Sequence, residues 1–190
     1  MEKHLPSSIV RFTQSWPVPF AWLAGIVAAI APSTNNPAQA QVIPTADGAD
    51  TTVTQTGEQY DIEGGTQAGN NLFHEFDQFS LTEDQTANFL GDSSVFNIVG
   101  QVSEVSPSYI DGTVQVTGSE ANLYLINPSG VLFGPNAQLS LQGSFTATTA
   151  DQIAFEDSTL NVLEQSQDYT GLTGAPTALT FSGESAGAVV

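Results

Sequence analysis

Short apolar runs of about four to six residues recur along the chain from Asn70 onward, and Gly, Pro, Asn or Asp interrupts them. Within several runs apolar and polar residues alternate, which is the period-two side-chain repeat of a β-strand. No window beyond residue 40 carries apolar residues at helical spacing over three turns, so the chain is predicted to be all-β. The predicted strands are Leu72–Phe76, Ala87–Leu90, Phe96–Val102, Thr113–Val116, Asn122–Ile126, Val131–Phe133, Gln138–Leu141, Ser144–Thr148, Gln152–Phe155 and Thr159–Leu163.

Two stretches are less regular. The polar segment from Pro44 to Gly69 is expected to hold short strands only at Val53 and at Tyr60–Ile62. The phenylalanines that follow are three residues apart, which is a helical spacing, but the Gly-Asn-Asn before them and the Ser after them limit any helix to one or two turns. These phenylalanines are Phe73, Phe76 and Phe79.

The strands could form either a sandwich or a solenoid. A sandwich favours hairpins with Asn-Gly or Asp-Gly turns, and only Asp47-Gly48 and Asp111-Gly112 are of that kind. Strand and turn units recur about every 20 to 25 residues, a period that is typical of solenoids. At ~4.8 Å per stacked strand, ~150 residues predict a β-helix of six or seven turns, ~30 Å long. The pattern alone favours the β-helix only weakly.

The first 40 residues read as a secretory signal peptide. Lys3 and Arg11 supply the positive region, Val18–Ala31 is apolar, and Ala38-Gln39-Ala40 is a cleavage site between Ala40 and Gln41. The alternative is a membrane anchor, but an apolar run of roughly 14 residues is shorter than the ~20 that cross a bilayer. We therefore expect a signal at 1–40, one domain at 41–190, and no stable membrane insertion after cleavage.

The remaining 150 residues have an unusual charge. No Lys or Arg occurs from residue 41 to residue 190, while nineteen of the twenty acidic residues lie there. Nucleic acid is excluded as a partner because phosphate binding needs cations, and an anionic membrane surface is disfavoured. The apolar content of 40% argues against disorder. There is no cysteine, so no disulfide stabilises the exported chain.

Five ordered motifs resemble those of cyanobacterial exoproteins of the filamentous haemagglutinin family. The opening motif, NNLFHEFDQF at residues 70–79, includes Asn71, Leu72, Phe73, His74 and Phe76. The most specific motif is ANLYLINPSGVLFGPNA at 121–137, which resembles the family's ANLFLINPNGVLFGPNA. The other three are QTANFL at 85–90, IDGTVQV at 110–116 and GSFTATTA at 143–150.

The N-terminal module of that family is the two-partner secretion domain. The resemblance implies a right-handed, single-stranded parallel β-helix with small capping or extra strands. It also implies binding, in the periplasm, by the POTRA domains of a partner outer-membrane β-barrel transporter, and export to the cell surface or the extracellular space. Such modules begin longer adhesins, so the end of the sequence at Val190 suggests a fragment without its C-terminal passenger.

One part of the family pattern is missing. The family carries two Asn-Pro motifs that secretion requires, and the second matches Asn127, Pro128, Ser129 and Gly130, with Ser in place of the usual Asn. At the place of the first the chain has Gly91-Asp92-Ser93-Ser94. Proline, an Asx cap and glycine are each explained by turn chemistry. Two readings therefore stay open: the second motif is a coil corner, or it contacts the transporter directly.

Enzymatic and metal-binding alternatives are weaker. His74 is the only histidine beyond residue 40, so no triad or multi-histidine site can form there, and we expect it to pack with the three phenylalanines of the opening motif. A polysaccharide-cleaving β-helix could use paired carboxylates, but the Arg or Lys that would neutralise uronate charge is absent. We expect no enzyme and no cofactor. An acidic calcium-binding or carbohydrate-associated surface protein remains the alternative, although the Gly-Gly-x-Gly-x-Asp repeat is missing.

Overall fold

The computed structural model describes residues 41–46, 48–103, 105–156, 158–164, 167–182 and 187–190, all within the unit Pro37–Val190. Every regular element among these residues is a β-strand, and none of them forms a helix of the length and apolar character that a bilayer span would need. Sheet A contains β1 (Val42–Pro44), β4 (Thr66–Ala68), β5 (Asn71–Phe79), β7 (Asn97–Val102), β10 (Asn122–Ile126) and β13 (Phe145–Thr148).

The other strands form three further sheets. Sheet B contains β2 (Thr51–Thr56), β3 (Gln59–Gly64), β6 (Thr86–Leu90), β9 (Thr113–Thr117) and β12 (Gln138–Ser140). Sheet C pairs β8 (Ser108–Ile110) with β11 (Val131–Phe133). Sheet D is antiparallel and contains β14 (Gln152–Ala154), β15 (Thr159–Asn161) and β16 (Ala178–Thr180). All ten strands predicted from the apolar runs are present, as are β2 and β3.

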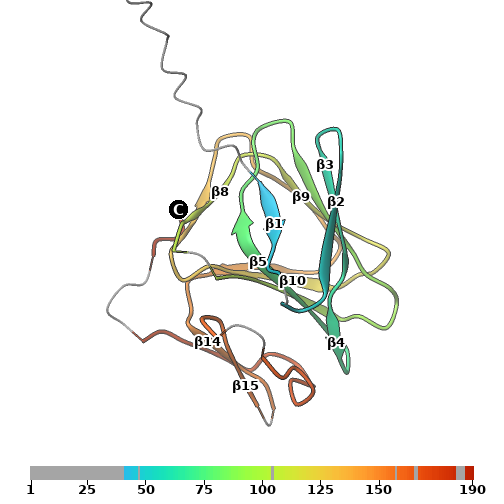
Figure 1. Cartoon of the computed structure of the whole chain (residues 1–190), viewed down its shortest axis with the longest axis vertical. Helices are drawn as coiled ribbons and strands as arrows, with labels where there is room; N and C mark the ends of the chain where they lie inside the picture. Colours follow the sequence, from blue (N-terminus) through green and yellow to red (C-terminus); the bar gives the residue numbers. More distant parts are fainter. Residues whose placement is uncertain (1–40, 47, 104, 157, 165–166, 183–186) are drawn as a thin grey trace, which may run out of the picture. The chain divides into compact units, whose positions relative to one another are not determined.

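The chain winds through sheets B, A and C in turn, which makes a parallel β-solenoid. Strands β6, β7 and β8 form one coil, and β9, β10 and β11 stack on them in parallel as the next. Figure 1 looks along this stack, with β2, β3 and β9 on one side, β5 and β10 on a second and β8 on a third. Parallel partners are 22 to 27 residues apart, from Leu123 and Phe145 to Thr86 and Thr113. The predicted parallel β-helix is confirmed over the sandwich.

The predicted length of six or seven turns is wrong, because the solenoid has about three. The prediction assigned all of the ~150 residues to stacked coils, but many of them form antiparallel strands instead. At the N-terminal end β1 and β4 pair antiparallel with β5, and β2 pairs antiparallel with β3. Beyond β13, the outer segment, which we define as residues 150–182, builds sheet D outside the coils. Composition gives no sign that such strands would leave the stack.

The buried apolar side chains form two clusters, one inside the coils and one on the outer face of sheet A. Inside the coils, side chains from sheets A, B and C fill the lumen, among them Ile62, Phe76, Phe89, Leu123 and Val131. A second cluster lies on the outer face of sheet A, where the outer segment covers it; its members include Phe73, Val99 and Ile126 from sheet A and Ile153, Phe155, Leu160, Tyr169 and Leu172 from the outer segment. Sheet A is therefore buried on both faces, which is why β7 is buried at all six positions.

The spacing of the phenylalanines in β5 has a β-sheet explanation. Pro44 pairs with Phe76 and Ile43 with Gln78, so Asp77 is an extra residue in β5. Such a bulge shifts the side-chain alternation by one position. As a result Phe76 and Phe79 both point into the lumen although they are three residues apart, and their rings meet at 5.3 Å. The helical spacing reflects a bulge and not a helical turn.

Candidate recognition site

The turn at Asn127–Gly130 joins β10 to β11. The Gly130 N–H donates to the Asn127 carbonyl at 2.9 Å, and the Ser129 N–H donates to Asn127 Oδ1 at 2.9 Å. Pro128 restricts φ at the second position, and Gly130 has a φ of 128°, which favours glycine. Each residue type in the motif therefore meets a requirement of this turn.

The side chain of Asn127 also links two coils. It is fully buried, and its Nδ2 donates to the Ser106 carbonyl at 2.9 Å and to Ser108 Oγ at 3.0 Å. The Pro128 carbonyl accepts a hydrogen bond of 2.9 Å from the Gly187 N–H. The turn therefore connects β10 and β11 to Ser106 and Ser108 of the preceding coil and to the last residues of the chain. These contacts support a structural role for the corner, and contact with a transporter stays a prediction.

The place of the missing first motif has the same turn geometry. Asp92 Oδ1 accepts hydrogen bonds from the Ser94 N–H at 2.7 Å and from Ser94 Oγ at 2.5 Å, and the Val95 N–H donates to the Asp92 carbonyl at 3.0 Å. The hydrogen bonds from Ser94 lower the pKa of the Asp92 carboxyl. The backbone pattern is that of Asn127–Gly130, with Asp92 in the role of Asn127. Loss of the Asn-Pro pair has therefore not removed the turn.

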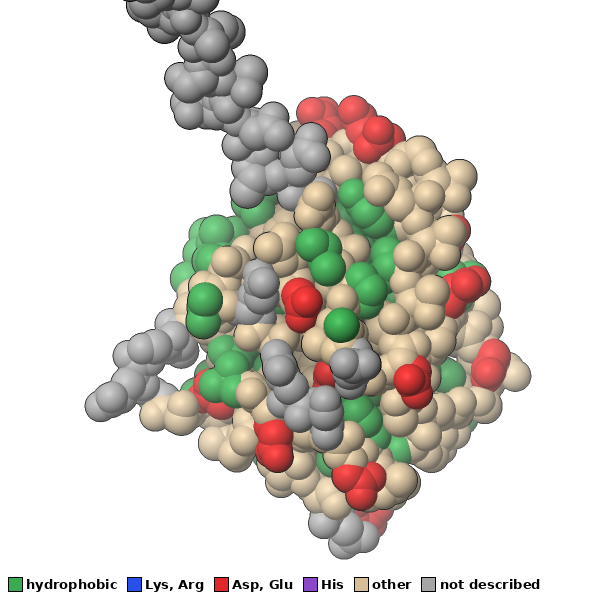
Figure 2. Space-filling view, in the orientation of Figure 1, with side chains coloured by type: hydrophobic (Ala, Val, Ile, Leu, Met, Phe, Trp, Pro, Cys, Tyr) green, Lys and Arg blue, Asp and Glu red, His purple; other side chains and the backbone are tan. Residues whose placement is uncertain are grey.

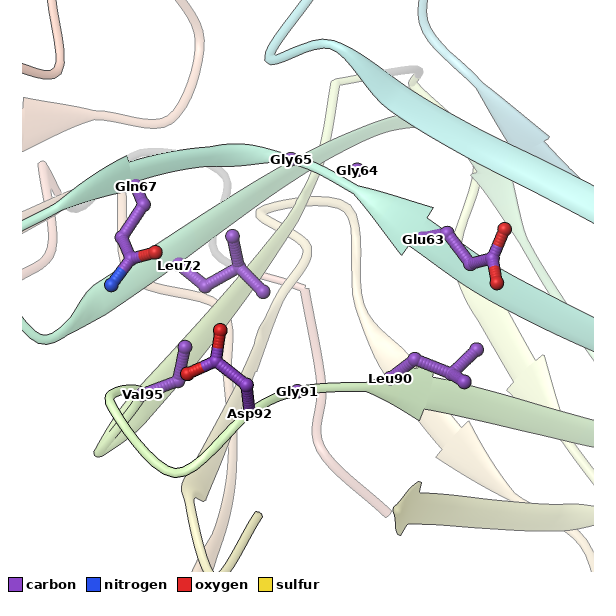
Figure 3. A pocket seen from close by; sticks show the side chains of 9 residues that line it. All are labelled: Glu63, Gly64, Gly65, Gln67, Leu72, Leu90, Gly91, Asp92 and Val95. Carbon is purple, nitrogen blue, oxygen red and sulfur yellow. The ribbon is translucent and has the colours of Figure 1, made fainter. Parts of the chain in front are cut away.

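A hollow of about 330 Å³ lies beside this turn, between the β3–β4 connection and the β6–β7 connection. Figure 3 shows the side chains of Gln67, from β4, and Asp92, from the β6–β7 connection, extending into this hollow, with Leu72 and Val95 beside them. Gln67 Nε2 donates to Ser94 Oγ at 3.1 Å, which joins β4 to the turn. The lining has carboxylates and an amide but no cationic group, so it suits hydrogen-bond donors and not anions.

The opening motif lies in β5, where its side chains alternate between the two apolar clusters. Leu72 and Phe76 face the lumen, and Phe73 faces the outer segment. His74 is fully buried; its ring lies 6.2 Å from that of Phe76 and 5.7 Å from that of Phe89. The expected packing of His74 among three phenylalanines is thus wrong for Phe73, which belongs to the other cluster because neighbours on a strand point to opposite faces.

The environment of His74 keeps the imidazole neutral. Burial lowers its pKa to about 4, since the charged form would lose its hydration. Nδ1 lies 3.4 Å from Thr51 Oγ1, and Nε2 has no hydrogen-bond partner among the described residues. A neutral histidine between aromatic rings packs as part of the core.

An asparagine ladder runs along the start of sheet A, and the sequence reasoning missed it. Asn97 Nδ2 donates to Asn71 Oδ1 at 2.8 Å, and Asn122 Nδ2 donates to Asn97 Oδ1 at 3.1 Å. The Ser144 N–H and Oγ continue the ladder by donating to Asn122 Oδ1. Asn71 Nδ2 ends it on the carbonyls of Leu172 and Gly174 in the outer segment. The signal was present, because asparagine precedes the apolar run of three successive coils.

A second polar network holds the outer segment on sheet A. Glu75, Gln101 and Tyr169 are all buried. Gln101 Nε2 donates to Glu75 Oε1 at 2.7 Å and to the Tyr169 hydroxyl at 3.1 Å, and the Tyr169 hydroxyl also donates to Glu75 Oε1. Burial, and then the bond and charge of Glu75, raise the pKa of Tyr169. No sequence signal connects residues 94 positions apart.

The remaining predicted site residues are the two at the cleavage site. Ala40 lies outside the described residues, and Gln41 is the first of them and is exposed. Within the described part of the chain no three His, Cys, Asp or Glu side chains gather into a group that could hold a metal ion. The motifs thus supply turns, a ladder and core packing.

Stacked parallel coils with an antiparallel N-terminal end and an outer sheet make this chain a β-solenoid domain. The family profile for the TPS secretion domain matches residues 29–187, which is most of the chain. The chain belongs to the TPS secretion domain family, and its role is therefore in two-partner secretion.

Two further comparisons were made. Among solved structures, a crystal structure of a filamentous hemagglutinin secretion domain is similar, with a TM-score of 0.48 and 23% sequence identity. The match covers 58% of this chain and 43% of that one, so the chain spans less than half of its length. No match was found among curated proteins.

Proposed function

We propose that this chain is the recognition domain of a surface exoprotein or adhesin, bound in the periplasm by the POTRA domains of a partner outer-membrane transporter. The match of the TPS secretion domain family to residues 29–187 is the observation that carries this proposal. The proposal includes removal of residues 1–40 as a signal peptide, with Gln41 as the new N-terminus. N-terminal sequencing of the exported protein tests that boundary. The role proposed is binding and export, without catalysis.

The negative charge of residues 41–190 supports a partner with a basic surface. Residues 41–190 contain no Lys or Arg, and Figure 2 shows carboxylates scattered over the visible face. An anionic chain is steered toward a basic surface, and this attraction weakens as salt screens it. We therefore expect the POTRA domains to bring positive potential to the encounter.

The folded solenoid leaves few free strand edges, which bears on the state that is recognised. Strands β5, β6, β7, β9 and β10 each pair on both sides. A partner that adds a strand to these edges can do so only before the coils stack. Stacking outside the cell then buries the lumen side chains, and the folded coils cannot pass back through a narrow pore. The paired strand edges and the one-way passage both support recognition of the chain before it has folded completely.

The central test is export of a cargo fused behind residues 1–190, with the partner transporter present. We expect export to stop when the domain is deleted and when the POTRA domains are removed. Continued export after either deletion contradicts the proposal. Capture of the chain by the purified POTRA pair should fall as salt rises, and absence of capture at low salt discards the electrostatic part.

A matched pair of substitutions separates the two interpretations of the second motif. Pro128→Ala changes the Asn127–Gly130 turn, and Pro135→Ala changes the β11–β12 turn, which is not part of an Asn-Pro motif. If only Pro128→Ala lowers export while both variants fold equally well, the motif contacts the transporter. If export follows the measured stability of each variant, the motif is a structural corner.

A further inference from the structure

A groove lies at the corner where the chain passes from sheet B to sheet A. It has a volume of about 620 Å³ and lies between the β6–β7 connection and the β9–β10 connection. The hollow of Figure 3 shares Val95 with it and lies one coil earlier, so the two follow each other along the stack. We call the larger one the corner groove. Its volume is within the range of about 300–1,000 Å³ that is usual for ligand sites.

An aromatic ring lies exposed in the corner groove. Phe96 is 59% exposed, whereas Val95 beside it is buried in the lumen cluster. The face of an aromatic ring carries partial negative charge. The C–H groups on one side of a pyranose ring are weakly positive, and they stack on such a face. Phe96 therefore supplies a platform for a sugar ring.

Polar groups that could bind sugar hydroxyls flank this ring. Ser93 and Glu120 line the corner groove and are exposed, and neither side chain has a hydrogen-bond partner among the described residues. A carboxylate accepts hydrogen bonds, and a serine hydroxyl both donates and accepts. The Asn122 side chain also lines the groove, but it is held by the asparagine ladder and forms a fixed part of the wall.

Charge and strand pairing narrow the class of ligand. Residues 41–190 contain no Lys or Arg, so an anionic glycan would meet only carboxylates and polar groups here. A peptide could not add as a strand, because β6, β7, β9 and β10 each pair on both sides. A neutral sugar needs neither a cation nor a free strand edge. It needs a ring face and hydrogen-bonding side chains, and the corner groove has both.

We propose that the corner groove binds a neutral oligosaccharide. One pyranose ring stacks on Phe96, and its hydroxyls donate to the Glu120 carboxylate and bond to the Ser93 hydroxyl. The next sugar units continue past Val95 into the neighbouring hollow, where Gln67 offers an amide. The site belongs to the folded domain, so its function does not rest on recognition by the transporter.

NMR titration of the purified chain tests this with defined probes. The neutral probes are hexasaccharides of glucose, mannose, galactose and xylose, and the charged probes are hexagalacturonate and hexalysine. We expect at least one neutral probe to bind with a Kd of about 1 mM or tighter, and hexagalacturonate not to bind at about 10 mM. The shifted amides should be those of residues 93–96 and 118–122. Added salt should leave this binding unchanged, because no charge on the ligand is screened.

Three substitutions locate the site and test the ring itself. Phe96→Leu keeps an exposed apolar side chain but removes the ring, and it should weaken binding about 10-fold, whereas Phe96→Trp should bind at least as well as the unchanged chain. Tyr109→Leu is the matched control, because Tyr109 is also an exposed aromatic residue but lies in β8 and does not line the groove. It should change the affinity less than about two-fold.

Each contrary outcome overturns the proposal. The proposal fails if no neutral probe binds at about 10 mM, a concentration at which a Kd of 1 mM gives near saturation. It fails equally if hexalysine alone binds, since the groove then recognises positive charge. Binding that shifts amides elsewhere, or that Phe96→Leu and Tyr109→Leu weaken alike, excludes the corner groove as the site. The amide shifts of the unchanged chain give this answer even if a variant does not fold.

Discussion

Replacing His74 with glutamine removes the only histidine of residues 41–190 and should flatten the dependence of stability on pH. In the folded chain burial lowers the pKa of His74 to about 4, whereas an unfolded chain has the ordinary value of 6.5. The unfolded state therefore binds a proton first as pH falls. Stability is complete above pH 6.5 and is lost as pH falls from there toward 4.

The size of the effect follows from the two pKa values. With 1.36 kcal/mol per pKa unit, the unchanged chain should lose about 2 kcal/mol by pH 5 and about 3 kcal/mol by pH 4 through this group. No carboxylate is among the groups that shift the pKa of His74, whose packed neighbours are Phe76, Phe89 and Thr51. Titration of the acidic residues affects both proteins alike, so the difference between them isolates His74.

Urea unfolding of both proteins at several pH values between 8 and 4.5 measures the difference. The free energy of unfolding of the unchanged chain should fall relative to His74→Gln as pH drops below 6.5, whatever the offset between the two proteins at pH 8. An NMR titration of the imidazole should show a midpoint near 4, in agreement with the lowered pKa. Parallel stability curves between pH 7 and pH 5 would refute the reasoning, because they would mean that His74 is hydrated in the fold.

Three other substitutions test the packing. Phe89→Ala empties the centre of the lumen, and thermal or urea unfolding should show a loss of about 3–5 kcal/mol. Asn97→Ala breaks two rungs of the ladder, and urea unfolding should show a loss of about 1–3 kcal/mol. Gly118→Ala should lower the melting temperature more than Gly57→Ala: both glycines have positive φ, but only at Gly118 would a Cβ lie 2.1 Å from a backbone oxygen, that of Gly91.

Much of the solenoid could be predicted because coil strands obey a local rule. A run such as Asn122–Ile126 alternates apolar and polar residues, and this pattern alone separates lumen from surface. The turn at Asn127 was equally predictable, since Asn, Pro and Gly each have a known place in a turn. β8 was missed because Ser108–Ile110 is too short and too polar to stand out. The motif in β5 suggested that its three phenylalanines form one cluster. In the fold, strand alternation places Phe73 on the outer face of sheet A, and the bulge in β5 brings Phe79 into the lumen with Phe76.

The contacts that hold the outer segment in place could not be read from the chain. Glu75 meets Tyr169, and Asn71 meets the carbonyls of Leu172 and Gly174, over separations of 94 to 103 residues. Nothing in composition says that a tyrosine so far away will bind a particular carboxylate. Such pairing depends on the return of the chain after β13, which brings Tyr169, Leu172 and Gly174 to the outer face of sheet A.

By itself the sequence determined the all-β class, the coil period, the corner turns and the anionic charge, because each depends on residue type over a few positions. The tertiary structure alone decided the number of coils and the burial of sheet A on both faces. Those features depend on where the chain leaves the stack and returns. Local propensity cannot set that path, since an apolar strand such as Gln152–Ala154 would fit equally well in another coil or in sheet D.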